Sequence, residues 1–115
     1  MPAGYSELFL EQGATFNTSI ALDDVAGEAF NLVLYTASSQ MRKSYYSSNA
    51  TAIFNVSTGA VPQNGVITLS LSANTTANIA AGRYVYDVYV TKDDNTERVR
   101  VLEGIINVTP QVTKV

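Results

Sequence analysis

The stretch that decides the fold is residues 79–92, which read IAAGRYVYDVYVTK. Large apolar side chains alternate here with smaller or polar ones, so Tyr84 and Tyr86 fall on one side of an extended chain and Tyr89 on the other. An alternation with a period of two is typical of a half-buried β-strand. We therefore predict a strand over Arg83–Lys92, with the first two tyrosines in a core.

The residues that flank this strand predict local structure on both sides of it. Ser72 is placed to cap a short helical turn before the strand. After it, residues 93–96 read DDNT, which is typical of a tight hairpin turn. The chain then enters a last strand, Arg98–Thr109, in which the apolar phase shifts. Because glycine often marks such a shift, we predict a bulge at Gly104.

Working back toward the N-terminus, the same alternation and short apolar runs bounded by turn residues predict the other strands. They are Tyr5–Glu11, Ala14–Leu22, Phe30–Met41, Thr51–Ser57 and Ile67–Leu71. The total is seven short strands and one helical turn, without an internal repeat or a linker. This pattern favours an all-β fold, an immunoglobulin-like antiparallel β-sandwich that occupies residues 1–115 as a single domain.

The predicted core consists of the side chains that face inward on these strands. They are Phe16, Ile20, Leu32, Leu34, Ile67, Leu69, Tyr84, Tyr86 and Val88. Residues 79–86 also resemble the start of the sixth strand in immunoglobulin-like domains, where a helical turn and a small residue precede a tyrosine. The resemblance implies that the Tyr84 hydroxyl bonds to upstream backbone, and that Tyr86 stands where antibody domains have their second cysteine.

Composition excludes several functional classes. The 115 residues contain no cysteine and no histidine, and the net charge is −3. Disulfides, thiolate metal sites and the commonest general base are therefore absent. An acidic chain lacks the basic footprint of a nucleic-acid-binding protein, and no apolar run is long enough to span a membrane. We expect a protein that is not an enzyme, has no cofactor or metal, binds neither nucleic acid nor membrane, and carries no signal peptide.

Two acidic runs offer oxygen ligands that could bind Ca²⁺, namely Asp23 and Asp24 with Glu28, and Asp93 with Asp94. Neither run has the spacing of a known calcium loop. Aspartate also forms turns by bonding to its own backbone, and we favour that interpretation for both runs.

Candidate interface residues lie in two segments. The first combines cations with aromatic rings, a combination enriched at protein interfaces. The alternatives are that this segment stacks on nucleic acid or glycan, or that it is only the solvated end of a strand. The second is the terminal segment, whose valines have few local partners. The candidates are Arg42, Lys43, Tyr45, Tyr46, Pro110, Val112 and Val115.

Several stretches together resemble a small immunoglobulin-like domain that is common in structural proteins of tailed bacteriophages. They are Glu11–Phe16, Tyr35–Ala37, Gln40–Arg42, Gly82–Val88, Arg100–Gly104 and Val108–Thr113. The chain is similar to the N-terminal domain of phage baseplate upper proteins and to short virion proteins of marine cyanophages. The resemblance implies an accessory or decorating subunit of the virion, present in multiple copies and bound to other virion proteins of the capsid, tail or baseplate. A glycan- or host-surface-binding module on the same fold is the alternative.

Overall fold

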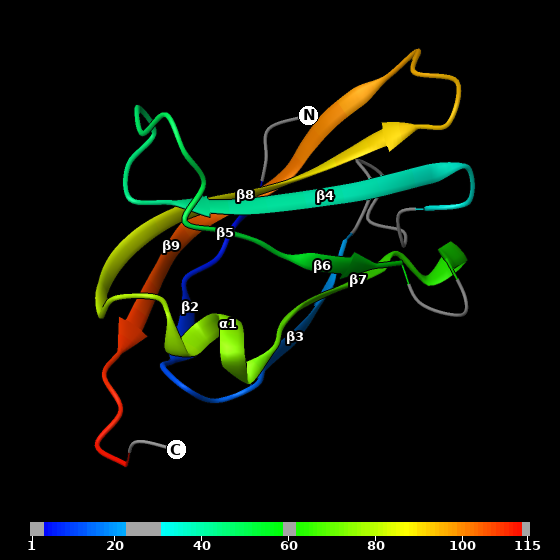
Figure 1. The fold of residues 1–115 in the computed structure, drawn as a ribbon. Helices are drawn as coiled ribbons and strands as arrows, with labels where there is room; N and C mark the ends of the chain where they lie inside the picture. The colour runs from blue at the N-terminus through cyan, green and yellow to red at the C-terminus, as the bar shows by residue number, and fades with distance from the viewer. Residues whose placement is uncertain (1–3, 23–30, 59–61, 114–115) are drawn as a thin grey trace.

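The computed structural model describes residues 4–22, 31–58 and 62–113, which form a sandwich of two β-sheets with one short α-helix (Figure 1). In chain order the elements are β1 (Gly4–Tyr5), β2 (Leu8–Glu11), β3 (Phe16–Ala21), β4 (Tyr35–Arg42), β5 (Ala52–Ile53), β6 (Asn55–Ser57), a 3₁₀ turn (Pro62–Asn64), β7 (Val66–Leu71), α1 (Ala73–Ala77), β8 (Gly82–Lys92) and β9 (Arg98–Thr109). The fold is the all-β, immunoglobulin-like sandwich that the sequence predicts.

The larger sheet has six strands in the order β1-β9-β8-β4-β5, with β2 also paired to β9, and the smaller sheet has the order β3-β7-β6. All pairings are antiparallel except those of β1 and β2, which run parallel to β9. The prediction of a purely antiparallel sandwich was therefore wrong at this edge. Alternation of side chains shows that a segment is a strand but carries no information on the direction of its partner.

Strand β8 confirms the prediction made from its sequence. Tyr84 and Tyr86 face inward and are buried, while Tyr89 faces outward and is half-buried. The Tyr84 hydroxyl donates a hydrogen bond to the Ala80 carbonyl at 2.7 Å, the upstream bond that the resemblance implied. The Tyr86 hydroxyl donates to the Ser6 carbonyl, also at 2.7 Å. Burial raises the pKa of Tyr86 to about 12, so this donor keeps its proton throughout the physiological range.

The short helix α1 follows the predicted capping. The Ser72 hydroxyl accepts a hydrogen bond from the Thr75 N–H at 3.3 Å, which satisfies one of the free donors of the first turn. Thr76 is fully buried, and its hydroxyl donates to the Ala14 carbonyl at 2.8 Å. The helix is thereby tied to the turn between β2 and β3.

Gly104 has a different role from the one the sequence suggested. The register of β8 with β9 is irregular between Val88 and Tyr89, where Val101 lacks a partner on β8, so the predicted bulge at Gly104 was wrong. The apolar phase does shift, but at Val101, and Gly104 lies in regular pairing opposite Tyr86. A Cβ on Gly104 would overlap the Ser6 carbonyl oxygen. Glycine is required here because β1 and β2 pass so closely.

The third strand begins later than predicted. Strand β4 starts at Tyr35, and the Tyr35 N–H donates to the Leu32 carbonyl at 3.0 Å, which closes a turn just before it. Within that turn Leu34 has a φ of 72° and is 63% exposed, so its assignment to the core was wrong. Leu32 is buried as predicted. Phe30 lies outside the described residues.

The fourth predicted strand crosses from one sheet to the other. Its first part, β5, pairs with β4 in the larger sheet, and its second part, β6, pairs with β7 in the smaller one. Phe54 lies at the crossing point, where it is buried and contacts Phe16, with 5.8 Å between the ring centroids. A single apolar residue thus anchors the change of sheet.

The core between the sheets contains most of the predicted residues. Ile67, Leu69 and Val88 are almost completely buried, together with Leu10, Met41 and Ile106, which the prediction did not include. Phe16 and Ile20 pack against this core but remain half-buried. Within the described residues no helix is long and apolar enough to cross a membrane.

Candidate interaction surfaces

The outer faces of the two sheets differ in their residues. On the larger sheet, Tyr5, Phe9 and Ile53 are 65%, 67% and 67% exposed. The outward residues of β3, β6 and β7 are serine, threonine, asparagine or alanine, apart from the half-buried Val66. Scattered exposed apolar residues are normal, whereas several on one face mark a candidate binding surface.

The centre of the larger sheet's outer face is a continuous cross-strand row. Cα register places Tyr5 opposite Glu103, Glu103 opposite Asp87, Asp87 opposite Gln40, and Gln40 opposite Ile53. Large apolar side chains therefore stand at both ends, and two carboxylates lie side by side in the middle. Like charges directly opposite each other destabilise a sheet unless neighbouring cations offset them.

Asp87 is the perturbed group of this row. Its partial burial raises the pKa of the carboxyl group above its usual range, and the neighbouring Glu103 raises it further. The guanidinium groups of Arg100 and Arg42 act in the opposite direction. Arg100 also pairs with Glu103, with 3.2 Å between Nε and Oε2. The face therefore presents both signs of charge between its apolar ends.

Two recesses flank Asp87. One, of about 140 Å³, is lined by Tyr45 and Val85, and the other, of about 300 Å³, is lined by Ser38 and Tyr89. Gln40, Arg42 and Asp87 line both recesses. A carboxylate, a guanidinium and an amide therefore lie between two tyrosines.

The predicted segment Arg42–Tyr46 borders this face. The Arg42 guanidinium donates to the Ser47 carbonyl at 3.0 Å and to the Gln40 side-chain oxygen at 2.9 Å, which fixes its position. Tyr45 and Tyr46 are 65% and 96% exposed. These residues stay a predicted interface, and Tyr45 also lines the smaller recess beside Asp87.

The other predicted residues lie at the same end of the larger sheet. The Lys43 ammonium stands 4.8 Å from the centre of the Tyr84 ring, a cation–π distance. Strand β9 ends beyond Val108, which is opposite Gly82 at the start of β8. Pro110 and Val112 follow and are exposed, while Val115 lies outside the described residues. Strand β8 separates the two predicted segments.

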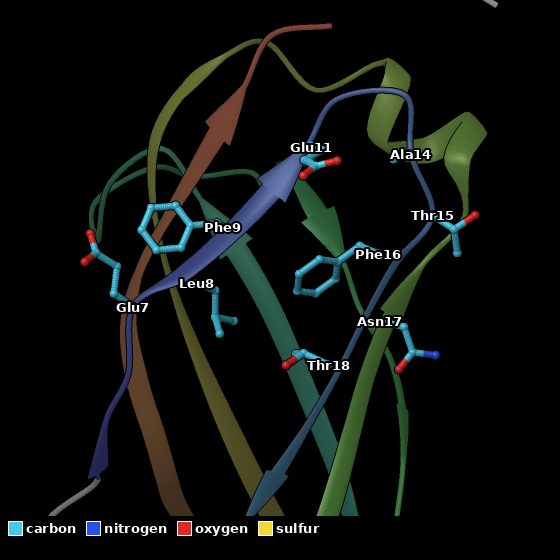
Figure 2. Close-up of a pocket in the computed structure, with 9 residues that line it drawn as sticks. All are labelled: Glu7, Leu8, Phe9, Glu11, Ala14, Thr15, Phe16, Asn17 and Thr18. Atoms are coloured by element: carbon cyan, nitrogen blue, oxygen red, sulfur yellow. The ribbon is translucent and has the colours of Figure 1, made fainter.

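A groove of about 470 Å³ lies between β2 and β3 (Figure 2). Figure 2 shows Leu8, Phe16 and Thr18 pointing into the space between the two strands, with Glu7 and Glu11 near the two ends of β2. Strand β2 belongs to the larger sheet and β3 to the smaller one, so the groove marks a side on which the sandwich is open.

The second acidic run forms a turn, as favoured from the sequence. The Asp94 carboxylate accepts hydrogen bonds from the Thr96 N–H at 3.0 Å and from the Thr96 hydroxyl at 2.6 Å. These bonds lower the pKa of Asp94. The first run, residues 23–28, lies outside the described residues. In the parts of the chain that the structure describes, no group of three or more potential metal-ligating side chains occurs.

Sequence reasoning missed the outer row and the groove. The signal for Phe9 was present, because it lies between Leu8 and Leu10, which face inward. Ile53 precedes the buried Phe54 in the same way. The alternation in these segments is consistent with an outward direction for both residues, but only the assembled sheet shows that they share a face with Asp87.

No family model matches this sequence, and no curated protein matches it either. Among solved structures, the chain is similar to CopC from Methylosinus trichosporium OB3b, with 14% identity, a TM-score of 0.49, and coverage of 94% of this chain and 90% of that one. It is also similar to the insect immune protein hemolin, with 20% identity, a TM-score of 0.44, and coverage of 100% of this chain and 27% of that one. A third similar structure is that of the NK cell receptor Nkp44, with 8% identity, a TM-score of 0.45, and coverage of 95% of this chain and 100% of that one. Likenesses this distant carry no argument about what the chain does.

Proposed function

We propose that the chain is a non-catalytic structural subunit of a phage virion, which docks on capsid, tail or baseplate proteins through the outer face of its larger sheet. The observation that carries the docking role is the difference between the two outer faces. Exposed aromatic and aliphatic side chains lie at both edges of the larger sheet's outer face, while the outer face of the smaller sheet consists mainly of serine, threonine and asparagine. The phage assignment rests on the sequence resemblance described above.

The composition of this face suits binding to another protein. Interfaces between proteins are enriched in tyrosine, phenylalanine and arginine. Tyr5, Tyr45 and Ile53 supply exposed apolar contacts, and Arg42 and Arg100 supply cations beside them. An arrangement of apolar anchors around a few charges gives both affinity and register.

The test follows the protein in the cells that produce it. A photo-cross-linking amino acid is placed at Ile53 in one version of the protein and at Ser70, on the smaller sheet, in a matched control. Assembled particles are then purified by density gradient. We expect both versions to sediment with the particles, and only the Ile53 version to cross-link to their structural proteins.

Two outcomes contradict the proposal. A protein that stays soluble and never sediments with particles is not a virion component. Cross-links from Ser70 that match those from Ile53 would mean that the larger sheet is not the docking face. As a second check, replacing Tyr45 and Ile53 together by serine is expected to reduce the amount bound to particles without unfolding the domain.

A glycan-binding module is the second candidate function, and the recesses beside Asp87 favour it. Tyr45 and Tyr89 could stack on sugar rings while Gln40, Arg42 and Asp87 bond to hydroxyl groups. Saturation-transfer NMR with neutral and acidic oligosaccharides tests this candidate. Transfer to a sugar that disappears in Tyr89→Ser supports it, and the absence of transfer from the whole panel excludes it for those sugars.

A further inference from the structure

The edge of β2 that faces the groove presents backbone groups without a strand partner in the described chain. The N–H groups of Ser6 and Gln12 donate to β9 carbonyls, each at 3.0 Å. Successive residues of a strand direct their backbone groups to opposite sides, so even-numbered residues face β9. Phe9 therefore directs its N–H and C=O away from β9 and into the groove.

Strand β3 presents the same feature from the other side. The Leu22 N–H donates to the Gly65 carbonyl at 2.8 Å, in register with the β3–β7 pairs. Even-numbered residues of β3 thus bond to β7, so Asn17 and Ser19 direct their backbone groups to the opposite edge of β3, and Asn17 lines the groove. Exposed edges of this kind can pair with an added strand, and β-strand addition is a recurring mode of peptide recognition.

The apolar interior is also open on this side. On β7, the inward-facing Ile67 and Leu69 are 1% and 0% exposed, whereas every inward-facing residue of β3 is only half-buried. Leu8, on the opposite wall of the groove, is half-buried as well. Apolar side chains from an added segment would therefore find Phe16 and Leu8 available for contact.

The charges around the groove indicate the chemistry of its occupant. Glu7 and Glu11 both line it and are exposed, and no lysine or arginine is among the lining residues. The Glu7 carboxylate is held in place, because it accepts a hydrogen bond from the Asn107 side-chain amide at 2.7 Å. A segment that carries positive charge complements this rim.

We propose that the groove between β2 and β3 binds an extended, basic segment of a partner protein by β-strand addition. Backbone pairing with the free edge of β2 gives the affinity, alternate apolar side chains cover Leu8 and Phe16, and lysine or arginine meets Glu7 and Glu11. This proposal goes beyond the docking role proposed above and does not depend on it. The groove lies between β2 and β3, away from the row through Asp87, so either proposal can fail while the other stands.

The test uses the whole chain, labelled with ¹⁵N, and a short synthetic peptide in which valine alternates with lysine and threonine. We expect amide shifts at Phe9 and Asn17, which line the groove, when this peptide is added. A matched peptide with glutamate in place of lysine is expected to cause none. Equal shifts with both peptides, or shifts confined to the outer face at Val85 and Ile105, would overturn the proposal.

Variants make the test specific. Glu7→Gln and Glu11→Gln are each expected to weaken binding about two- to fivefold, the range of an exposed ion pair. Glu103→Gln, on the outer face, is the control and should leave binding unchanged. Equal weakening by Glu103→Gln, or no effect of the Glu7 and Glu11 variants, contradicts the proposal.

A proline substitution tests the role of the edge itself. Phe9→Pro removes an N–H that faces the groove and none that bonds to β9, which is the position where an edge strand tolerates proline. Phe9→Ala keeps the N–H and is the matched control. We expect at least tenfold weaker peptide binding for the proline variant than for the alanine variant, at the same melting temperature; equal binding by the two variants contradicts pairing at β2. If the proline variant does not fold, the charge variants and the two peptides decide the question.

Discussion

The two sheets of this sandwich have similar inner faces and different outer faces. Inside, both contribute almost completely buried aliphatic residues, such as Leu69 from the smaller sheet and Ile106 from the larger one. Outside, the smaller sheet is polar, whereas the larger one exposes Phe9 and Ile53. Burial of the inner faces is what stabilises the fold. The exposed apolar residues of the larger sheet contribute little buried surface to that stability, and they are accessible to another molecule.

The largest expected effect contrasts the two faces of one strand. Tyr86→Ala empties a buried site and removes the bond to Ser6, so we expect it to lower the free energy of unfolding by about 3–5 kcal/mol. Tyr89→Ala, on the outward face of the same strand, should lower it by about 1 kcal/mol or less. Urea unfolding measures both. Equal losses would mean that the two faces of β8 do not differ as the structure describes.

Gly104→Ala is expected to have the next largest effect, and it tests the close contact between β9 and the segment that joins β1 to β2. The added methyl group meets the Ser6 carbonyl, so the backbone must move, and we expect a loss of about 1–3 kcal/mol in unfolding free energy. Gly4→Ala is the control, since the nearest atom to its new Cβ would lie at 3.6 Å, an ordinary contact. A harmless Gly104→Ala would show that β1 and β2 do not pass as closely as described.

Asp87→Asn tests the cost of the charge at the centre of the outer face. The pKa of Asp87 is higher in the folded state, so the folded state binds this proton more tightly than the unfolded state does. The stability that this group contributes is therefore lost as the pH rises through the raised pKa and the carboxyl group ionises. We therefore expect Asp87→Asn to raise the melting temperature modestly near pH 7. The gain should vanish at acidic pH, below both the folded and the unfolded pKa. A lower melting temperature near pH 7 would mean that Arg42 and Arg100 outweigh burial.

The smallest expected effects come from exposed positions on the two outer faces. Ile53→Ser removes an exposed apolar residue from the larger sheet, and Ser57→Ile adds one to the smaller sheet. Both should change the free energy of unfolding by about 0.5 kcal/mol or less, because neither side chain is buried. Only Ile53→Ser should reduce binding to particles. A large loss of stability in Ile53→Ser would mean that the residue belongs to the core.

The sequence alone determined the features that depend on neighbours along the chain. The inward and outward alternation of β8, the cap at Ser72 and the Asp94 turn all follow from backbone periodicity or from side chains that bond within a few residues. The bond from Tyr84 to Ala80 spans only four residues, and the resemblance implied it for the same local reason. The alternation around Phe9 also indicates that this side chain points outward, but it does not show which other residues lie on the same face.

Which distant residues meet depends on how the strands assemble in three dimensions. The parallel pairing of β2 with β9, the contact of Gly104 with Ser6 and the crossing at Phe54 depend on which strands become neighbours. The same holds for both candidate surfaces. The outer row joins residues from five strands, and the groove joins edges that belong to different sheets. A period of two gives the face on which a side chain lies but not the strand beside it, since pairing is set by packing of the whole sandwich.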